Sequence, residues 1–389
     1  MELYVHIPFC VRKCLYCDFL SFATDREHRE SYIDALVKEL GSFSGLLSDA
    51  CGFRTAFIGG GTPSVLENDL SEKLLSSIRS LIADNAEFSL ECNPGTVDRE
   101  KLKLYKEYGI NRLSIGLQSA DDAELKILGR IHDYNTFLDT YELARSAGFE
   151  NINIDIMSGL PGQTVQGWEN TLKKVAGLSP EHISAYSLII EPGTPFYDIY
   201  GQERKVRTPA VLLPDEDDER RMYHLTSEIL SGFGFHRYEI SNYAKEGFEC
   251  RHNLGYWKNE EYLGAGIGAS SYVGIADNKS RYKNTDNFEE YIDKAQNGSF
   301  EELHIEKEKI DAAGAEEEFI ILRMRLSEGI DKKEYKERFN KDFDHIFSRL
   351  IGRYTAAGLI KDTPDRISFT EEGFDVSNTI LADMITCCV

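Results

Sequence analysis

The sequence predicts an α/β fold: an open, partial (β/α)6 barrel, followed by an α+β extension and a winged-helix-like C-terminal domain. Strand-like and helix-like segments alternate six times up to about residue 200. The pattern then becomes aromatic and glycine-rich, and the last part of the chain has the order helix, helix, helix, hairpin. We therefore divide the chain into residues 1–200, 201–305 and 306–389.

The barrel region is predicted from short apolar strands separated by amphipathic helices. The strand pattern covers residues 3–7, 55–58, 87–91, 112–116, 152–157 and 182–190. The helical pattern covers residues 27–43, 71–83, 99–108, 121–147 and 166–176. Six βα units are too few for a closed eight-unit barrel and imply an open parallel sheet with its helices outside. Ligands of such sheets collect at the carboxyl ends of the strands.

The extension begins with a helix that the acidic run 215–219 opens. Such acids more often complement a helix N-terminus than bind a cation. Residues 235–273 are too apolar and aromatic for a linker, so we expect them to pack against the barrel. The glycines at 264, 266 and 268 lack the strand–turn–helix context of a phosphate loop, which favours a tight structural turn.

The C-terminal region contains helical patterns at 316–326, 332–339 and 343–357, followed by a hairpin at 358–373. A DNA-binding wing is expected to be basic. Eleven Lys and Arg stand against sixteen Asp and Glu from Ile310 to Val389. A packing or partner role is therefore preferred.

Composition narrows the functional classes. The chain has 389 residues, 41% of them apolar and 28% charged, and a net charge of −22. This charge argues against a nucleic-acid partner, because such binding depends on Lys and Arg at phosphates. No apolar run approaches the ~20 residues of a membrane span, although peripheral membrane contact stays open. Because no export signal is visible, we expect a cytoplasmic protein with reduced cysteines.

Three cysteines lie within eight residues in the loop after the first strand. Cys10, Cys14 and Cys17 have the spacing C-x3-C-x2-C. Three thiolates can hold three irons of a cubane cluster and leave the fourth iron open. A structural zinc site would want a fourth Cys or His nearby, and Phe19 and Phe22 occupy the next stretch. The spacing therefore predicts a [4Fe–4S] cluster.

This loop resembles the signature of the radical-SAM superfamily, which implies that S-adenosylmethionine (SAM) binds at the open iron of a radical-SAM barrel. Other segments resemble the oxygen-independent coproporphyrinogen III oxidase group. They are YVHIPFCVRKCLYCDF, FIGGGTPS, ECNPG, RLSIGLQS, LGRIH, DIMSGLPGQT and HNLGYW, and together they cover about 250 residues in consistent order.

Two branches of that group differ near the cluster. The oxidases have a fourth cysteine two positions after the third, where this sequence has Phe19, and a longer N-terminal extension. Here the chain begins nine residues before Cys10. Both departures, together with HNLGYW, are similar to the HemW-type haem chaperones.

The predicted SAM site combines strand-end residues with a glycine loop. Glycines after the second strand allow close backbone approach, and the absence of G-x-G-x-x-G sets a dinucleotide site aside. Carboxylates at strand ends can accept hydrogen bonds from ribose hydroxyls and from an amino group. With the positions that the resemblance implies, the predicted SAM residues are Tyr4, Tyr16, Gly60, Gly61, Thr62, Glu91, Gln118, Arg130 and Asp155.

Residues 250–257 combine groups that haem requires. A Cys or His can ligate the iron, aromatic rings can cover the macrocycle, and an Arg can pair with a propionate. Alone, the segment is more typical of a turn anchored by aromatics, with His252 a satisfied core residue. The resemblance to the chaperone branch predicts haem binding by His252, Asn253, Tyr256 and Trp257. Family members usually have a His in the next glycine segment, where this sequence has Ala269 and Ser270.

The favoured function is a radical-SAM [4Fe–4S] protein that binds haem and passes it to an acceptor protein. One alternative is the oxygen-independent oxidase, which decarboxylates coproporphyrinogen III to protoporphyrinogen IX. Another is a radical-SAM enzyme with a different substrate, since one fold serves many reactions. The sequence identifies neither the acceptor nor the electron donor, and it assigns no catalytic residue.

Overall fold

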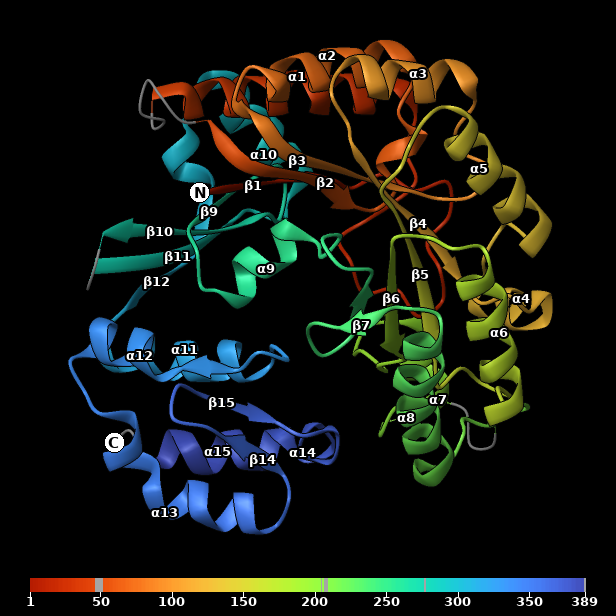
Figure 1. Cartoon of the computed structure of the whole chain (residues 1–389). Helices are drawn as coiled ribbons and strands as arrows, with labels where there is room; N and C mark the ends of the chain where they lie inside the picture. The colour runs from red at the N-terminus through yellow and green to blue at the C-terminus, as the bar shows by residue number, and fades with distance from the viewer. Residues whose placement is uncertain (46–51, 204, 206–208, 276–277, 388–389) are drawn as a thin grey trace.

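The predicted partial barrel is present in the computed structural model, which describes residues 1–45, 52–203, 205, 209–275 and 278–387. Six strands lie side by side in sequence order, and each is parallel to the next. They are β1 (Glu2–Ile7), β2 (Phe53–Gly60), β3 (Ile82–Cys92), β4 (Arg112–Gln118), β5 (Ile152–Ser158) and β6 (His182–Ser187). Figure 1 shows the helices of these units outside the curved sheet, as predicted.

Those helices are α1 (Arg26–Ser42), α2 (Asn68–Arg79), α3 (Arg99–Glu107), α4 (Asp122–Leu128), α5 (Tyr134–Ser146) and α6 (Val165–Gly177). The single helical stretch expected at 121–147 is divided because Gly129 ends α4 in the left-handed conformation, with φ +78°. β3 begins five residues earlier than expected, at Ile82, so α2 ends at Arg79. β6 ends at Ser187, short of the expected residue 190.

The extension continues the sheet on both edges, which is more than the predicted packing. β9 (Tyr262–Ala265) pairs in parallel with β1, and β10 (Ser270–Ile275), β11 (Asn278–Asn284) and β12 (His304–Ile310) follow antiparallel. At the other edge, β8 (Asn242–Ala244) and β7 (His236–Arg237) follow β6, which gives a twelve-stranded sheet. The main hydrophobic core runs from β1–β6 into β9 and α10 (Phe288–Asn297).

Two local predictions for the extension are confirmed. The side chain of Asp215 accepts a hydrogen bond from Asp218 N at the start of α8 (Glu216–Gly232), so the acidic run caps a helix. Gly266, with φ +100°, lies in a tight turn, where an added Cβ would come within 2.5 Å of the Tyr32 hydroxyl. Three helices were not predicted: α7 (Pro195–Tyr200), α9 (Arg251–Trp257) and α10.

The C-terminal region has the predicted order of three helices and a hairpin. The helices are α11 (Ala312–Met324), α12 (Lys332–Phe339) and α13 (Phe343–Ala356), and the strands are β14 (Ile360–Asp362) and β15 (Arg366–Phe369). β13 (Ile330–Asp331) completes a three-stranded sheet. α14 (Glu371–Asp375) and α15 (Ser377–Thr386) were not predicted.

This region has a hydrophobic core of its own, whereas residues 1–200 and 201–305 share one. The three-part division therefore stays a proposal. Over the part of the chain that the structure describes, no helix is long and apolar enough to cross a membrane.

Candidate functional site

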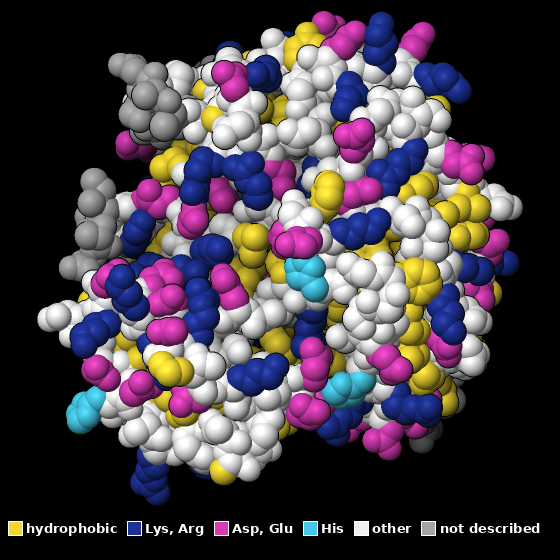
Figure 2. Space-filling view, viewed as in Figure 1, with side chains coloured by type: hydrophobic (Ala, Val, Ile, Leu, Met, Phe, Trp, Pro, Cys, Tyr) yellow, Lys and Arg dark blue, Asp and Glu magenta, His cyan; other side chains and the backbone are white. Residues whose placement is uncertain are grey.

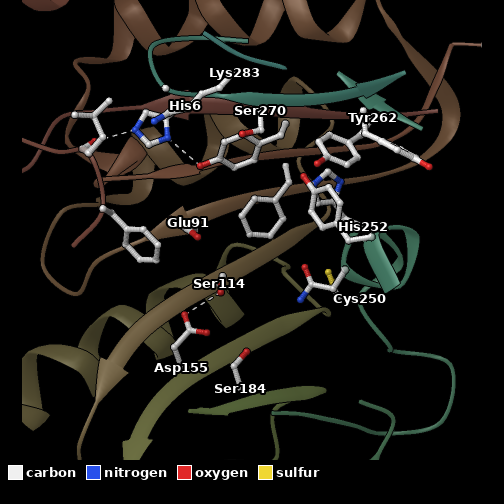
Figure 3. Close-up of a pocket in the computed structure, with 18 of the residues that line it drawn as sticks. His6, Glu91, Ser114, Asp155, Ser184, Cys250, His252, Tyr262, Ser270 and Lys283 are labelled. Atoms are coloured by element: carbon white, nitrogen blue, oxygen red, sulfur yellow. Dashed lines mark hydrogen bonds between the residues drawn. The ribbon is translucent and has the colours of Figure 1, made fainter. Parts of the chain in front are cut away.

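A cavity of about 960 Å³ lies between the barrel, the extension and α11. Figure 2 shows a hollow near the centre of this face, with hydrophobic side chains visible in it and charged groups of both signs around it. One wall carries carboxyl and hydroxyl groups from β3–β6, and the opposite wall carries α9 and β9–β11 (Figure 3). Typical ligand sites occupy about 300–1,000 Å³, so this cavity is large enough for a sizeable ligand.

The cysteine loop lies beside this cavity. Cys10, Cys14 and Cys17 are partly exposed free thiols, and the loop residues Lys13 and Phe19 line the cavity. Among the described residues, no three His, Cys, Asp or Glu side chains converge as a site for a single metal ion. A cubane does not require such convergence, because its thiolates bind different irons.

A chain of hydrogen bonds joins two of the cysteines to the strand ends. Cys10 Sγ lies 3.5 Å from Thr62 Oγ1, which accepts from Asn93 Nδ2 at 2.6 Å. Arg130 donates to Asn93 Oδ1 at 2.7 Å and lies 3.6 Å from Cys14 Sγ. These contacts orient the cysteine loop and place the Arg130 guanidinium beside Cys14.

The predicted glycine loop allows the end of β2 to lie close to the cysteine loop. An added Cβ at Gly60 would come within 2.5 Å of the His6 ring, and one at Gly61 would come within 2.8 Å of Phe9 O. Gly61 N and Thr62 N donate to Ile7 O and Phe9 O, both at 2.8 Å. The glycines thus let the end of β2 lie directly against the residues that precede Cys10.

Two half-buried carboxyls, Glu91 and Asp155, lie in the β3–β5 wall. Burial and the neighbouring Asp155 raise the pKa of Glu91 to about 8, although Gly60 N donates to its carboxylate at 3.1 Å. Burial also raises the pKa of Asp155, while hydrogen bonds from Asn153 (2.7 Å) and Ser114 (3.0 Å) oppose the shift. Two carboxyls that resist ionisation in one cavity favour a ligand that brings positive charge.

The haem motif forms α9, which is attached to the barrel. Glu87 of β3 accepts hydrogen bonds from Arg251 N and His252 N, both at 3.0 Å. His252 Nδ1 lies 2.8 Å from Thr55 Oγ1, and Nε2 lies 3.0 Å from Tyr256 Oη.

Burial lowers the pKa of His252 to about 3, so the ring is neutral although Glu2 lies 3.9 Å away. Both ring nitrogens are engaged, and the residue is only 1% exposed. In this conformation His252 is the satisfied core histidine that the sequence left open as an alternative.

The predicted residues fall into separate groups. Those that line the cavity are Tyr4, Glu91, Asp155, His252, Asn253 and Tyr256. Thr62 and Arg130 line a smaller crevice with Cys14 instead. Tyr16 packs against Phe196, and Gln118 ends β4 in the left-handed region with φ +73°. Trp257 is half-buried at the end of α9 and is not part of the cavity wall among the described residues.

Several polar residues were not predicted: Arg112, Ser114, Asn153 and Ser184 in the cavity wall, and Asn93 in the smaller crevice. The first four occupy alternate positions in strands that helices cover on their outer face. Alternation of polar and apolar residues within such strands places the polar set on the inner face. This alternation was the available signal.

The residues fit a cluster with SAM. The buried Nε of Arg130 has no hydrogen-bond partner within the described residues, and it lies beside the cysteine loop. Three thiols in one loop, an arginine with an unused donor and two carboxyls that favour a cation match the donor set of a [4Fe–4S] cluster and the charges of SAM.

Comparisons with known proteins agree with this geometry. Residues 4–175 match the radical SAM superfamily, and residues 312–376 match the HemN C-terminal domain. The heme chaperone HemW of Bacillus subtilis (strain 168) is 35% identical, with 97% of each chain covered. HemW of Escherichia coli (strain K12) is 33% identical over 98% of this chain and 97% of its own.

Among solved structures, coproporphyrinogen III oxidase (HemN) from Escherichia coli has a TM-score of 0.81. It is 22% identical, over 100% of this chain and 89% of the other, so this likeness concerns the fold alone. Membership of the radical SAM superfamily implies a [4Fe–4S] cluster and SAM as cofactors. On the near full-length identities, this chain belongs to the HemW family of radical SAM proteins.

Proposed function

We propose that this protein is a haem chaperone: it binds haem in the 960 Å³ cavity and transfers it to an acceptor protein. The observation that carries the proposal is the position of this cavity between the cysteine loop and the α9 motif. Tyr256, Tyr262 and Tyr272 line its extension side and Phe57 its barrel side, so aromatic rings are available to cover a flat apolar macrocycle. The curated relatives named heme chaperone support the same function.

The cluster would be held by Cys10, Cys14 and Cys17, with Arg130 and Thr62 next to the thiolates. SAM would lie between the cysteine loop and the Glu91–Asp155 wall. When bound, cluster and SAM together supply one-electron chemistry at a carbon–sulfur bond. The chain contributes the low-dielectric wall, the cation-favouring carboxyls and the positions of the thiolates.

Two observations favour the chaperone over the oxidase. Phe19 stands where the oxidases have their fourth cysteine, and it is 68% exposed at the edge of the cavity. The near full-length relatives at 33–35% identity are named heme chaperone, whereas the solved oxidase structure is 22% identical in sequence. The acceptor is a protein that recognises this chain, and the cluster requires an electron donor.

The test pairs two measurements on the same anaerobically reconstituted protein. Haem is titrated while the Soret band is recorded, and coproporphyrinogen III decarboxylation is assayed in parallel. Stoichiometric haem binding, release to an apo-haemoprotein and no decarboxylation are expected. Decarboxylation without haem binding would refute the chaperone function and support the oxidase.

The contribution of His252 needs a paired design, because Tyr256 occupies its Nε2. If His252 is the iron ligand, Tyr256→Phe frees that nitrogen and preserves or tightens haem binding, whereas His252→Ala abolishes the low-spin Soret signal. If both variants bind haem like the wild type, His252 is a structural residue and the ligand lies elsewhere.

A further inference from the structure

One cation in the cavity wall has no ionic partner that satisfies it. Arg112, the first residue of β4, is 2% exposed and lines the cavity. Its Nε is buried without a hydrogen-bond partner among the described residues. Glu87 and Asp155 are near enough to interact with its charge, but within the described part of the chain neither forms an ion pair with the guanidinium. A buried, unpaired charge is costly, so a permanently charged guanidinium in a cavity favours an anionic ligand.

The groups next to Arg112 in the described structure make no hydrogen bond to its guanidinium. Ser89, paired in register with Arg112 on β3, has a buried hydroxyl that also lacks a partner among the described residues. The nearby carboxylate of Glu87 accepts instead from Cys250 and from the first N–H groups of α9. Arg112 is close enough to lower the pKa of His252, although burial is the larger cause.

Arg112 lies one register step from Glu91, since Ser89 pairs with Arg112 and Glu91 with Ser114. The cysteine loop lies farther along β4, where Arg130 contacts both Gly116 O and Cys14 Sγ. The carboxylate of SAM, held with its amino group at the open iron, would therefore lie farther along β4 than Arg112.

We propose that Arg112 binds a carboxylate of the cargo, a haem propionate, at the α9 end of the cavity. This inference rests on the proposed function and adds the orientation of the ligand. One propionate lies in the depth of the cavity against Arg112, and the macrocycle lies among the aromatic rings of Tyr256, Tyr262 and Phe57. The planar guanidinium suits a carboxylate because it can donate two parallel hydrogen bonds.

The test compares ferric haem with its dimethyl ester, both titrated anaerobically into cluster-loaded wild-type protein and Arg112→Gln. The wild type should bind the free acid about tenfold to a hundredfold more tightly than the ester. Arg112→Gln should bind both forms alike, at about the affinity of the wild type for the ester. Arg112→Lys should restore part of the preference, because a point charge cannot donate in two parallel directions.

Controls separate the proposal from its alternatives. Arg26→Gln removes a surface cation that pairs with Asp69, and it should leave the preference intact. A weaker SAM affinity of Arg112→Gln with unchanged haem affinity would overturn the proposal and assign Arg112 to the carboxylate of SAM. Equal binding of acid and ester by the wild type would overturn it without any variant, so misfolding of Arg112→Gln cannot hide the outcome.

Failure of the chaperone function and failure of the Arg112 assignment give different results. A wild type that binds neither porphyrin form refutes the chaperone function and this inference together. A wild type that binds haem but shows no preference for the free acid refutes only the role of Arg112.

Discussion

Replacing Glu91 with Gln tests the electrostatics of the proposed SAM site. The pKa of Glu91 is raised from 4.5 to about 8, mainly by burial and further by Asp155. At 1.36 kcal/mol per pKa unit, the carboxylate form is disfavoured by at most about 5 kcal/mol, less where water enters the cavity. At pH 7 the group is therefore mostly protonated, and a cationic ligand that needs the carboxylate must displace its proton.

Linkage gives the expected pH dependence. Below pH 8, each SAM bound by the wild type should release one proton, so its Kd falls about tenfold per pH unit and levels off above pH 8. Glu91→Gln cannot ionise, so its Kd should lack this dependence and exceed that of the wild type most strongly at pH 9. Titration of SAM itself affects both proteins equally and cancels in the ratio of their Kd values.

The stability of the SAM-free protein should change in the opposite sense. A raised folded-state pKa contributes stability that is fully present below pH 4.5 and is lost as the pH rises through about 8. Glu91→Gln lacks this loss, so its apparent Tm relative to the wild type should rise from pH 6 to pH 9.

The assays are equilibrium dialysis of SAM and thermal unfolding of the cluster-loaded proteins, both without oxygen. A Kd ratio that does not change between pH 6 and pH 9 would refute the assignment of Glu91 as the titrating SAM contact. A Tm difference that does not change with pH would refute the raised pKa of Glu91 in the folded protein.

Three further predictions concern the cluster and the sheet. Cys14→Ser should abolish bound iron and the brown absorption at roughly 400 nm, and full iron content would contradict the assignment of Cys14 as a cluster ligand. Asn93→Ala breaks the link from Thr62 to Arg130, so a chelator should remove iron faster at unchanged circular dichroism; an unchanged rate would count against that link. Glu39→Ala leaves three buried donors, on Gly266, Asn284 and Tyr291, without their acceptor. The free energy of unfolding in urea should fall by about 3 kcal/mol or more, and by less for Glu39→Gln.

The sequence predicted those features of the fold and of the site that depend on local sequence pattern. The six βα units followed from periodicity, and the cysteine loop from spacing, because both depend on neighbours along the chain. The pairing of β9 with β1 was not predictable, because a four-residue strand carries little signal and its partner lies some 260 residues away. Likewise, no local sequence pattern indicated that both ring nitrogens of His252 would be hydrogen-bonded, to Thr55 and to Tyr256.

Strand β3 explains how one wall can serve two ligands. Glu87 holds the start of α9, and Glu91, four residues further on, contacts Gly60 at the carboxyl end. Four strand residues span about 13 Å, and the ladders to β2 and β4 fix that length. The distance between the haem motif and the proposed SAM wall is therefore a property of the sheet, not of a loop.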